Sequence, residues 1–541
     1  MTTPSQPPAH TSAATPSRRA LLTGGSTAAD ASPRNRAPGG LLNRFLNVIE
    51  WSGNKLPDPI IIFAGLCALT LVASAVAGLG GWSAVHPGTG ETLVATNLLS
   101  TEGMRVVIGD AAKTFGAFAP LGQVLIIMLG IGVAERSGWF EVGLTQAMTS
   151  APKGLIIPAI ALIGLLGNIA GDAAPIVLPP LAALIFLKLG WHPIAGIALA
   201  YAAATGGFAA NLMIGMSDAL VQGFTQEAAV IIDPDIETTV PMNWWFIAAS
   251  VVVLLPVLWL VTTKIAIPRL GAYQETDDVE AGDMEVTDVQ RRANRWALVA
   301  LALFAALVVA ACIPQGSFLR NAETGSLTTD APLMNGIGLI LALAFFLPGL
   351  VYGVRAKTIT RSSDVARMMV ESMATMASFI VVVFFASQLL SYVSASNMGA
   401  ILAIRGAELL QGQDGIVLIL GIIAISAVVN LFVGSASAKW AILAPIFIPM
   451  MMLLGYHPAF TQMVYRIGDA VTNPITPMFP YFALVLTYAQ RYDKKLGIGT
   501  FISTLVPYSL AMGLVWTAMM VVWYLLGWPM GPDGPIHLPT P

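Results

Sequence analysis

The stretch YRIGDAVTNPITPMFP, residues Tyr465–Pro480, decides the fold class of this chain. It stands in an otherwise apolar run, yet it carries Arg466 and Asp469 and, shortly after them, Thr472 and Asn473. Three prolines then follow at every third position, so a regular helix cannot continue. Broken backbone in a bilayer is tolerated only where protein or a water-filled cavity surrounds it. The stretch predicts a substrate or ion site within a membrane; the alternative is a kinked helix whose Arg466 and Asp469 neutralise each other.

The composition of the whole chain is that of a polytopic membrane protein. Of 541 residues, 56% are hydrophobic and only 11% are charged, whereas soluble domains carry roughly 25% charged residues. The net charge is −3, and no basic tract indicates binding to nucleic acid. Residues 1–40 contain no aromatic residue and are predicted to form a disordered tail. Five arginines near the amino end predict that this tail is cytoplasmic.

Apolar segments and their basic flanks predict an all-α fold of about nine transmembrane helices and two re-entrant hairpins. Each half of the chain is predicted to hold one hairpin and, directly after it, one broken helix. These segments are, in order, a first half (41–295) with hairpin 1 (about 154–190) and a broken helix (about 192–224), then a second half (296–541) with hairpin 2 (about 415–455) and a broken helix (about 458–490). This topology predicts a cytoplasmic amino end and an external carboxyl end.

An internal repeat relates the two halves. Four residues recur 265 positions later: Pro180, Gly190, His192 and Pro193 correspond to Pro445, Gly455, His457 and Pro458. Five predicted spans separate the copies, and because that number is odd, the second copy is inverted and its hairpin enters from the opposite side. Inverted repeats with broken helices at the midplane are typical of secondary transporters. The two histidines, each before a proline, are predicted to cap helices rather than to bind metal.

Motifs of soluble enzyme chemistry are absent from the sequence. It has no HExxH pair, no Walker lysine loop and no nucleophile elbow. We therefore expect a protein that is not an enzyme, and one that draws energy from an ion gradient because it has no nucleotide-binding domain. Two other classes remain as alternatives, an ion channel and an intramembrane enzyme. The latter would have to pair Asp172 with Asp218 or Asp469.

Several strings of the sequence resemble the AbgT family, the p-aminobenzoyl-glutamate transporters. The resemblance runs from about Leu42 to Gly531 and rests on GNKLPDP (Gly53–Pro59), GVAERSGW (Gly132–Trp139), GNIAGDA (Gly167–Ala173), GSASAKWAILAP (Gly434–Pro445), YRIGDAVTN (Tyr465–Asn473) and PYFALVLTYAQRYDKK (Pro480–Lys495). It implies a homodimeric inner-membrane transporter that imports p-aminobenzoyl-glutamate or exports sulfonamide-type antimetabolites. The alternative substrate is another small carboxylate, coupled to Na⁺.

The resemblance also implies four substrate-site residues. They are Asp172 in hairpin 1, Trp440 in hairpin 2, and Pro458 and Arg466 in the broken helix that follows. The chain departs from the family at the tip of hairpin 1, where Gly171–Pro175 reads GDAAP and the family usually reads Ser-Asp-Ala-Gly-Tyr.

Each of these side chains suggests a chemistry. The guanidinium of Arg466 suits a carboxylate or sulfonyl group, and Trp440 offers either a flat face to an aminobenzoyl ring or ordinary packing. Asp172 would bind a cation, carry a proton or cap a hairpin arm. Lys439 would either snorkel or pair with a carboxylate. No cofactor is expected besides a coupling ion, H⁺ or Na⁺. The predicted ion ligands are Asn168, Asn211, Asp469, Thr472 and Asn473.

Overall fold

The structure is a computed structural model, and it describes residues 59–85, 90–149, 152–167, 173–273, 286–327 and 331–538. All of these belong to one compact unit, Ile49–Pro541. The predicted tail at 1–40 lies outside the described residues, as do two predicted site residues, Asn168 and Asp172.

Helices make up nearly all of the regular structure in the described ranges. The first half contains α2 (Pro59–Leu79), α3 (Thr101–Gly109), α4 (Ala111–Ala117), α5 (Ala119–Arg136), α6 (Trp139–Thr149), α7 (Ile156–Leu166), α8 (Ala173–Lys188), α9 (Pro193–Tyr201), α10 (Met216–Ala229), α11 (Trp244–Val261), α12 (Ile267–Leu270) and the short turns η1 (Lys153–Leu155), η3 (Ala202–Gly206), η4 (Val240–Asn243) and η5 (Thr262–Ala266). The second half contains α13 (Asp288–Cys312), α14 (Pro332–Asn335), α15 (Ile337–Ala356), α16 (Ser362–Thr375), α17 (Ala377–Ala395), α18 (Met398–Leu410), α19 (Gly415–Phe432), α20 (Ala436–Leu453), α21 (Pro458–Thr472), η6 (Asn473–Ile475), α22 (Phe482–Gln490) and α23 (Ile498–Leu525). One antiparallel hairpin joins β1 (Ser83–Val85) to β2 (Thr92–Val94).

Eight helices in the described ranges are long and apolar enough to cross a membrane, or nine if the bent pair Ala111–Ala117 and Leu121–Arg136 counts as one span. The eight are Ile60–Leu79, Val240–Leu270, Asp288–Cys312, Ile337–Ala356, Ala377–Ala395, Gly415–Phe432, Ala436–Leu453 and Ile498–Leu525. The prediction of an all-α polytopic membrane protein is confirmed. The membership of the set differs from the prediction in two respects: both arms of predicted hairpin 2, α19 and α20, are long enough to count, and the two predicted broken spans, about 192–224 and 458–490, are not in the set.

The first broken helix starts and stops where the sequence indicates. His192 caps α9, because its ring Nδ1 accepts the Ile194 amide at 3.3 Å. The helix then loosens into the π-helical turn η3 and ends in irregular backbone before α10 begins at Met216. A Cβ on Gly206 would lie 2.9 Å from the Pro474 ring, so a glycine here allows the two breaks of the chain to approach.

The second broken helix repeats this design. His457 caps α21 by accepting the Ala459 amide at 3.2 Å, which confirms the capping prediction for both histidines. After Thr472 the helix tightens into η6, and the prolines keep the chain irregular until α22 begins at Phe482.

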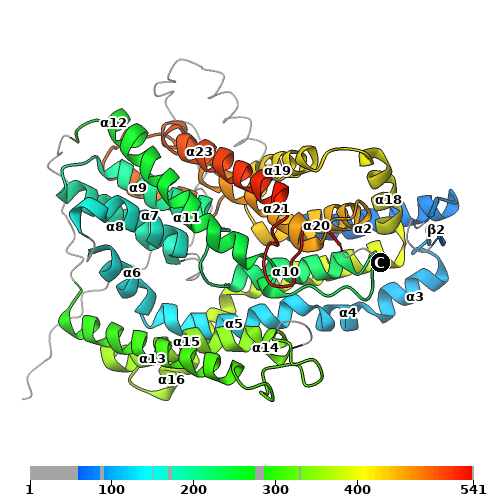
Figure 1. The fold of residues 1–541 in the computed structure, drawn as a ribbon, viewed down its shortest axis with the longest axis horizontal. Coiled ribbons are helices and arrows are strands. Elements are labelled where there is room, and N and C mark those ends of the chain that lie inside the picture. The colour runs from blue at the N-terminus through cyan, green and yellow to red at the C-terminus, as the bar shows by residue number, and fades with distance from the viewer. Residues whose placement is uncertain are drawn as a thin grey trace, which may run out of the picture. The chain divides into compact units, whose positions relative to one another are not determined.

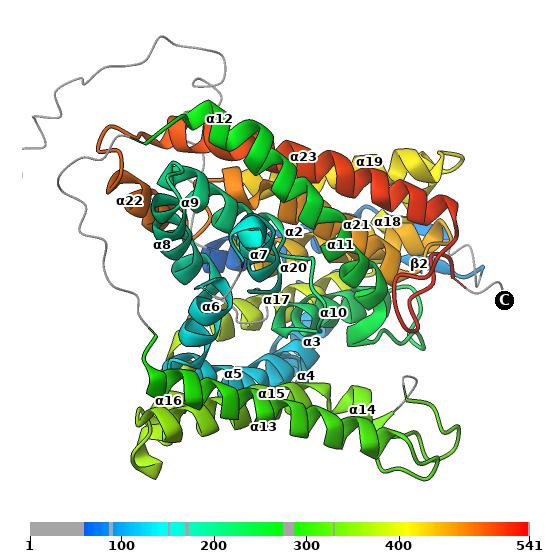
Figure 2. The same cartoon turned by 60° about the vertical axis from the view of Figure 1, so that its left-hand side comes forward.

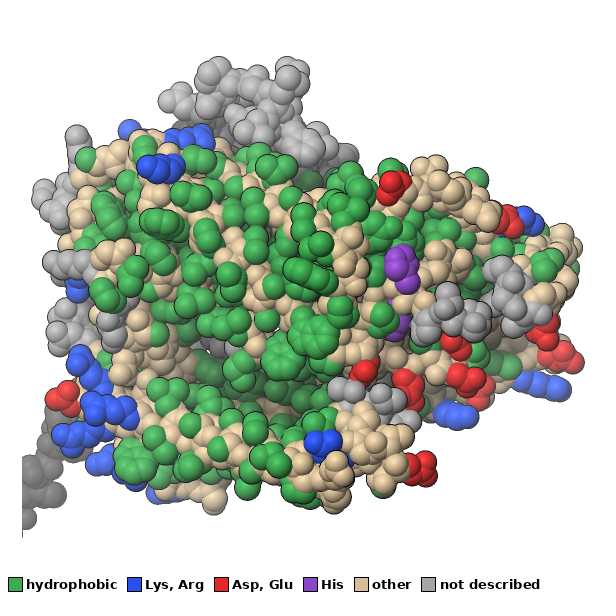
Figure 3. Space-filling model, in the orientation of Figure 1, with side chains coloured by type: hydrophobic (Ala, Val, Ile, Leu, Met, Phe, Trp, Pro, Cys, Tyr) green, Lys and Arg blue, Asp and Glu red, His purple; other side chains and the backbone are tan. Residues whose placement is uncertain are grey.

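The helices of the described unit form two groups. In one, α5 packs against α15 and α16, and α13 packs against α15; in the other, α21 packs against α19, α20, α10 and α23 (Figures 1 and 2). Figure 3 shows hydrophobic side chains across the middle of one face, with Lys and Arg gathered on the left and Asp and Glu mainly on the right. A hydrophobic middle between two charged ends is typical of a membrane protein.

Candidate functional site

Helix α21 lies at the centre of the candidate site. Every residue from Pro458 to Val471 is buried. Its polar side chains Gln462, Arg466 and Asp469 recur at helical spacing, and each is less than 5% exposed. A buried helix with charged residues needs partners on neighbouring elements, and α10, α19 and α20 provide them.

Arg466 forms a buried ion pair with Asp218 of α10. Its Nη1 lies 2.6 Å from Asp218 Oδ1, and the two side chains are 5% and 6% exposed. The second carboxylate oxygen of Asp218 accepts the Gly215 amide at 2.7 Å, which fixes the start of α10. The alternative in which Arg466 and Asp469 neutralise each other is wrong, because each pairs with a residue of another helix. The pair joins the first half of the chain to the second.

Asp469 pairs instead with Lys439 of α20. Lys439 Nζ lies 2.5 Å from Asp469 Oδ1, and the side chains are 1% and 5% exposed. The same ammonium donates to Asn430 Oδ1 of α19, and the Tyr465 hydroxyl donates to Asp469 Oδ1 at 3.3 Å. The two open interpretations of Lys439 are thereby decided in favour of pairing with a carboxylate.

Trp440 follows Lys439 and is completely buried. Its ring stacks on Tyr465, with the ring centres 4.2 Å apart and the planes at 25°. Its Nε1 donates to Thr225 Oγ1 at 2.9 Å and to the Val221 carbonyl at 3.1 Å. The structure therefore shows Trp440 packed against another aromatic ring, and the role of its face in binding an aminobenzoyl ring stays a prediction.

A chain of hydrogen bonds runs from Trp440 to the start of α21. Thr225 donates to Gln462 Oε1 at 2.5 Å, and Gln462 Nε2 donates to Asn243 Oδ1, also at 2.5 Å. Asn243 in turn donates to the Ala459 carbonyl at 2.7 Å, directly after Pro458. Two predicted site residues are thus linked through polar groups of α10, η4 and α21.

Two further predicted ion ligands, Thr472 and Asn473, lie next to the Lys439–Asp469 pair, and a third, Asn211, does not. Asn430 Nδ2 donates to Thr472 Oγ1 at 2.8 Å and to Asn473 Oδ1 at 2.9 Å, and Asn473 donates to the Thr205 carbonyl of η3 at 3.1 Å. Asn211 forms a local turn instead, since its Oδ1 accepts the Met213 amide at 3.3 Å.

Sequence reasoning missed Asp218, Asn430 and Lys439 as parts of the site. Asp218 entered only as a partner in the enzyme alternative, although an acidic residue just after a broken apolar helix was a usable signal. The signal for Asn430 was its position 262 residues after the predicted ion ligand Asn168, close to the 265-residue shift of the repeat. In the described ranges, no group of three or more His, Cys, Asp or Glu side chains has the geometry to hold a metal ion.

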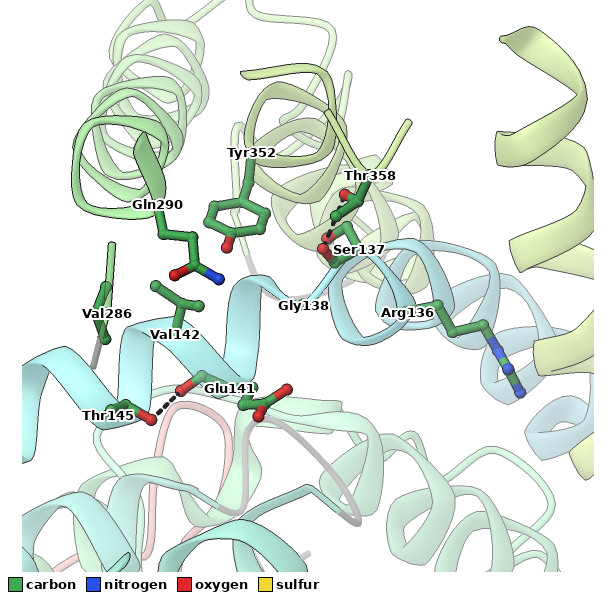
Figure 4. Close-up of a pocket in the computed structure, with 10 residues that line it drawn as sticks. All are labelled: Arg136, Ser137, Gly138, Glu141, Val142, Thr145, Val286, Gln290, Tyr352 and Thr358. Carbon is green, nitrogen blue, oxygen red and sulfur yellow. Dashed lines mark hydrogen bonds between the residues drawn. The ribbon is translucent and has the colours of Figure 1, made fainter. Parts of the chain in front are cut away.

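A separate cavity of about 460 Å³ lies between the ends of other helices. Its lining comprises Arg136, Ser137, Gly138, Glu141, Val142, Thr145, Val286, Gln290, Tyr352 and Thr358. Figure 4 shows Arg136 pointing away from Tyr352 and Gln290, and its Nη1 lies 2.8 Å from Glu371 Oε2. None of the predicted site residues lines this cavity.

Comparison with known proteins identifies the family. The model of the AbgT transporters matches residues 44–538. The chain belongs to the AbgT family. The p-aminobenzoyl-glutamate transport protein of Escherichia coli is 39% identical over 486 residues, which cover 90% of this chain and 95% of that protein. AbgT membership makes the chain a multi-pass membrane transporter that acts on a small molecule, and not an enzyme.

Two solved structures share the AbgT fold. The YdaH transporter of Alcanivorax borkumensis, described as having an unusual topology, has a TM-score of 0.83 and 41% identity, covering 88% of this chain and 100% of that one. MtrF of Neisseria gonorrhoeae, described as illuminating a class of antimetabolite efflux pumps, has a TM-score of 0.86 and 39% identity, covering 91% of this chain and 100% of that one.

Proposed function

We propose that this AbgT protein is a secondary transporter that moves p-aminobenzoyl-glutamate or sulfonamide-type antimetabolites across the inner membrane, driven by a gradient of H⁺ or Na⁺. The relative in Escherichia coli is named for p-aminobenzoyl-glutamate transport, and MtrF is described in terms of antimetabolite efflux. The observation that carries the proposal is the buried pair of Arg466 and Asp218 beside Trp440. The alternative is another small carboxylate as substrate.

Asp218 acts in this proposal as the internal stand-in for a substrate carboxylate. Its Oδ1 accepts a hydrogen bond from Nη1 of the Arg466 guanidinium at 2.6 Å. A substrate carboxylate can replace it without leaving the guanidinium unpaired, and the fork of donors suits a bidentate contact. Asp218 then keeps the Gly215 amide as a partner, so the exchange transfers the penalty of a buried charge without its ion pair from the guanidinium to Asp218.

The aromatic part of the substrate would enter between Trp440 and Tyr465. These rings already stack at 4.2 Å, which is the separation of two flat rings in direct contact. Tyr465 is one residue before Arg466 and Trp440 is one residue after Lys439. An aminobenzoyl ring that displaced Tyr465 from Trp440 would bring its glutamate end towards the guanidinium.

The architecture in this proposal is an inverted repeat with re-entrant hairpins. Helices α7 and α8 form hairpin 1, α19 and α20 form hairpin 2, and the breaks after η3 and α21 meet near the midplane. The side rich in Lys and Arg (Figure 3) would face the cytoplasm together with the amino end, and the carboxyl end would lie outside. The transporter is further proposed to be a homodimer, with Asp172 as a second residue of the substrate site.

Flux measurements on purified protein in liposomes test this function. We expect saturable uptake of labelled p-aminobenzoyl-glutamate or a sulfonamide that depends on an imposed pH or sodium gradient. The variant Arg466→Ala should abolish it. The control Arg405→Ala, which breaks an exposed pair with Glu408 at 2.9 Å, should not. Passive ion conductance without substrate flux would instead indicate a channel and overturn the proposal.

A further inference from the structure

We infer that the ammonium of Lys439 is the resident cation of the oxygen cluster at the second break, and that sodium does not bind there while Lys439 is present. The oxygen cluster consists of Asp469 Oδ1 and Asn430 Oδ1, which contact the Lys439 ammonium, and of Thr472 Oγ1 and Asn473 Oδ1, which accept from the Asn430 amide nitrogen. It contains all the described ion ligands predicted from sequence except Asn211. Sodium sites in transporters use hard oxygen ligands beside irregular backbone. The oxygens of this cluster would therefore suit sodium, and what matters is whether another cation already occupies the position.

The position of the Lys439 ammonium answers that question. Nζ lies 2.5 Å from the Asp469 carboxylate and also donates to Asn430 Oδ1. Both charged side chains are at most 5% exposed, so water does not screen them. An ammonium is a compact point charge with three donors, comparable in charge to the alkali cation that the same oxygens would hold.

The amide of Asn430 is fixed in the orientation that serves a cation. Its Nδ2 faces three acceptors, namely the Asp469 carbonyl at 2.6 Å, Thr472 Oγ1 at 2.8 Å and Asn473 Oδ1 at 2.9 Å. With its donor side committed to these three oxygens, the amide must present Oδ1 towards Lys439.

Among the described residues, charge balance argues against a second cation at this cluster. One carboxylate and one ammonium are already neutral together, and the nearby carboxylate of Asp218 is engaged by Arg466 at 2.6 Å. A sodium ion added beside Lys439 would place two cations against the single Asp469 carboxylate in a buried environment, where an unpaired charge is costly. The predicted sodium site at Asp469, Thr472 and Asn473 therefore does not fit this chain.

Within the described part of the first repeat, the positions that correspond to this pair carry no charge. Shifted by 265 residues, Lys439 and Asp469 correspond to Ala174 and Ala204, both of which are buried and uncharged. At these positions the tethered cation belongs to the second repeat. There it is coupled to the ring stack, since Tyr465 both bonds to Asp469 and stacks on Trp440.

The test is the sodium dependence of thermal stability in purified protein without substrate. Sodium chloride replaces choline chloride at constant ionic strength. Methylammonium chloride is a second probe, because methylammonium resembles the end of the lysine side chain that Lys439→Ala removes. A ligand that binds only the folded state raises Tm in a saturable way. We expect no saturable sodium effect for the wild type or for Lys439→Arg, and a saturable rise in Tm with sodium or methylammonium for Lys439→Ala.

Two controls fix the site of any response. The variant Lys264→Ala removes an exposed lysine and should remain insensitive to sodium. The double variant Lys439→Ala/Asp469→Asn removes the anion of the cluster and should lose the response that Lys439→Ala gains.

Two outcomes overturn the inference. One is a saturable sodium effect in the wild type that Asp469→Asn abolishes. The other is a folded Lys439→Ala protein that responds to neither cation. If Lys439→Ala does not fold, the wild type and Asp469→Asn still decide the first outcome. The inference bears on ion coupling only if the proposed transport function is right. The binding experiment itself contains no substrate, so its result is independent of whether the protein transports the proposed substrate.

Discussion

Replacing the two members of the Arg466–Asp218 pair, singly and together, separates a substrate anchor from an internal brace. The variants are Asp218→Asn, Arg466→Met and the double substitution. Asparagine keeps the shape of Asp218 and an oxygen for the Gly215 amide, which lies at 2.7 Å. Methionine keeps an unbranched apolar stem and removes the charge. Each single variant therefore leaves one buried charge without its partner.

The structure sets the size of the effect. The pair is 2.6 Å apart, and its side chains are 5% and 6% exposed. Two unit charges about 4 Å apart attract by about 4 kcal/mol at an effective dielectric constant of about 20. Breaking a buried pair by removing one partner typically costs about 3–5 kcal/mol, whereas replacing both is often nearly neutral. We expect both single variants to lose stability by this amount and the double variant to recover most of it.

Binding and stability are measured on the same preparations, as Tm in detergent and as affinity for labelled p-aminobenzoyl-glutamate. Asp218→Asn should bind more tightly, by about tenfold for each 1.4 kcal/mol of competition that is removed. Arg466→Met and the double variant should not bind. If the double variant recovers both Tm and wild-type affinity, Arg466 is structural and the exchange of carboxylates is refuted.

Three further predictions concern the hydrogen bonds of Trp440, the cap of α21 and the orientation of the predicted hairpins. Thr225→Val leaves Trp440 Nε1 and Gln462 without the hydroxyl that lies 2.9 and 2.5 Å away; we expect a loss of about 1–3 kcal/mol and weaker substrate binding, with the exposed Thr487→Val unchanged. Burial lowers the pKa of His457, just before α21, to about 4, and Asp533 acts in the opposite direction. Because the unfolded chain binds the proton near pH 6.5, Tm should fall as pH drops from about 6.5 to 4, and His457→Asn should flatten that profile; an unchanged profile would contradict the role of His457. Cysteines at Ser437 and at Ala170 should react with impermeant reagents from opposite sides of the membrane in at least one state, and labelling from one side only would exclude inverted hairpins.

Local chemistry in the sequence was enough to predict the breaks and the caps. The three closely spaced prolines after Asn473 each remove a backbone donor and disfavour a continuous helix, and a histidine before a proline at a helix start has an acceptor in reach of the next free amide. His192 and His457 meet this expectation with nearly the same geometry, 3.3 and 3.2 Å.

The partners of the buried charges were not predictable in the same way. Arg466 and Asp469 are three residues apart, a spacing that favours a pair on an isolated helix. In the folded chain each faces a different neighbour, so Arg466 meets Asp218, which is 248 residues away in sequence. Tertiary packing decided against the local pair. Hydropathy likewise does not decide between hairpin arms and spans for the predicted hairpin 2, because α19 and α20 are as apolar and as long as a crossing helix.

The two ion pairs are mechanically connected because both use α21. Arg466 reaches α10, which belongs to the first half, and Asp469 reaches α20, which carries Trp440. A rotation or shift of α21 that releases one pair therefore acts on the other within a single turn of helix. Tyr465 lies between them, bonded to Asp469 and stacked on Trp440. Under the proposed function, a substrate that took Asp218's place on Arg466 would thus act on the same helix that is joined to α20, an arm of the predicted hairpin 2, through Lys439.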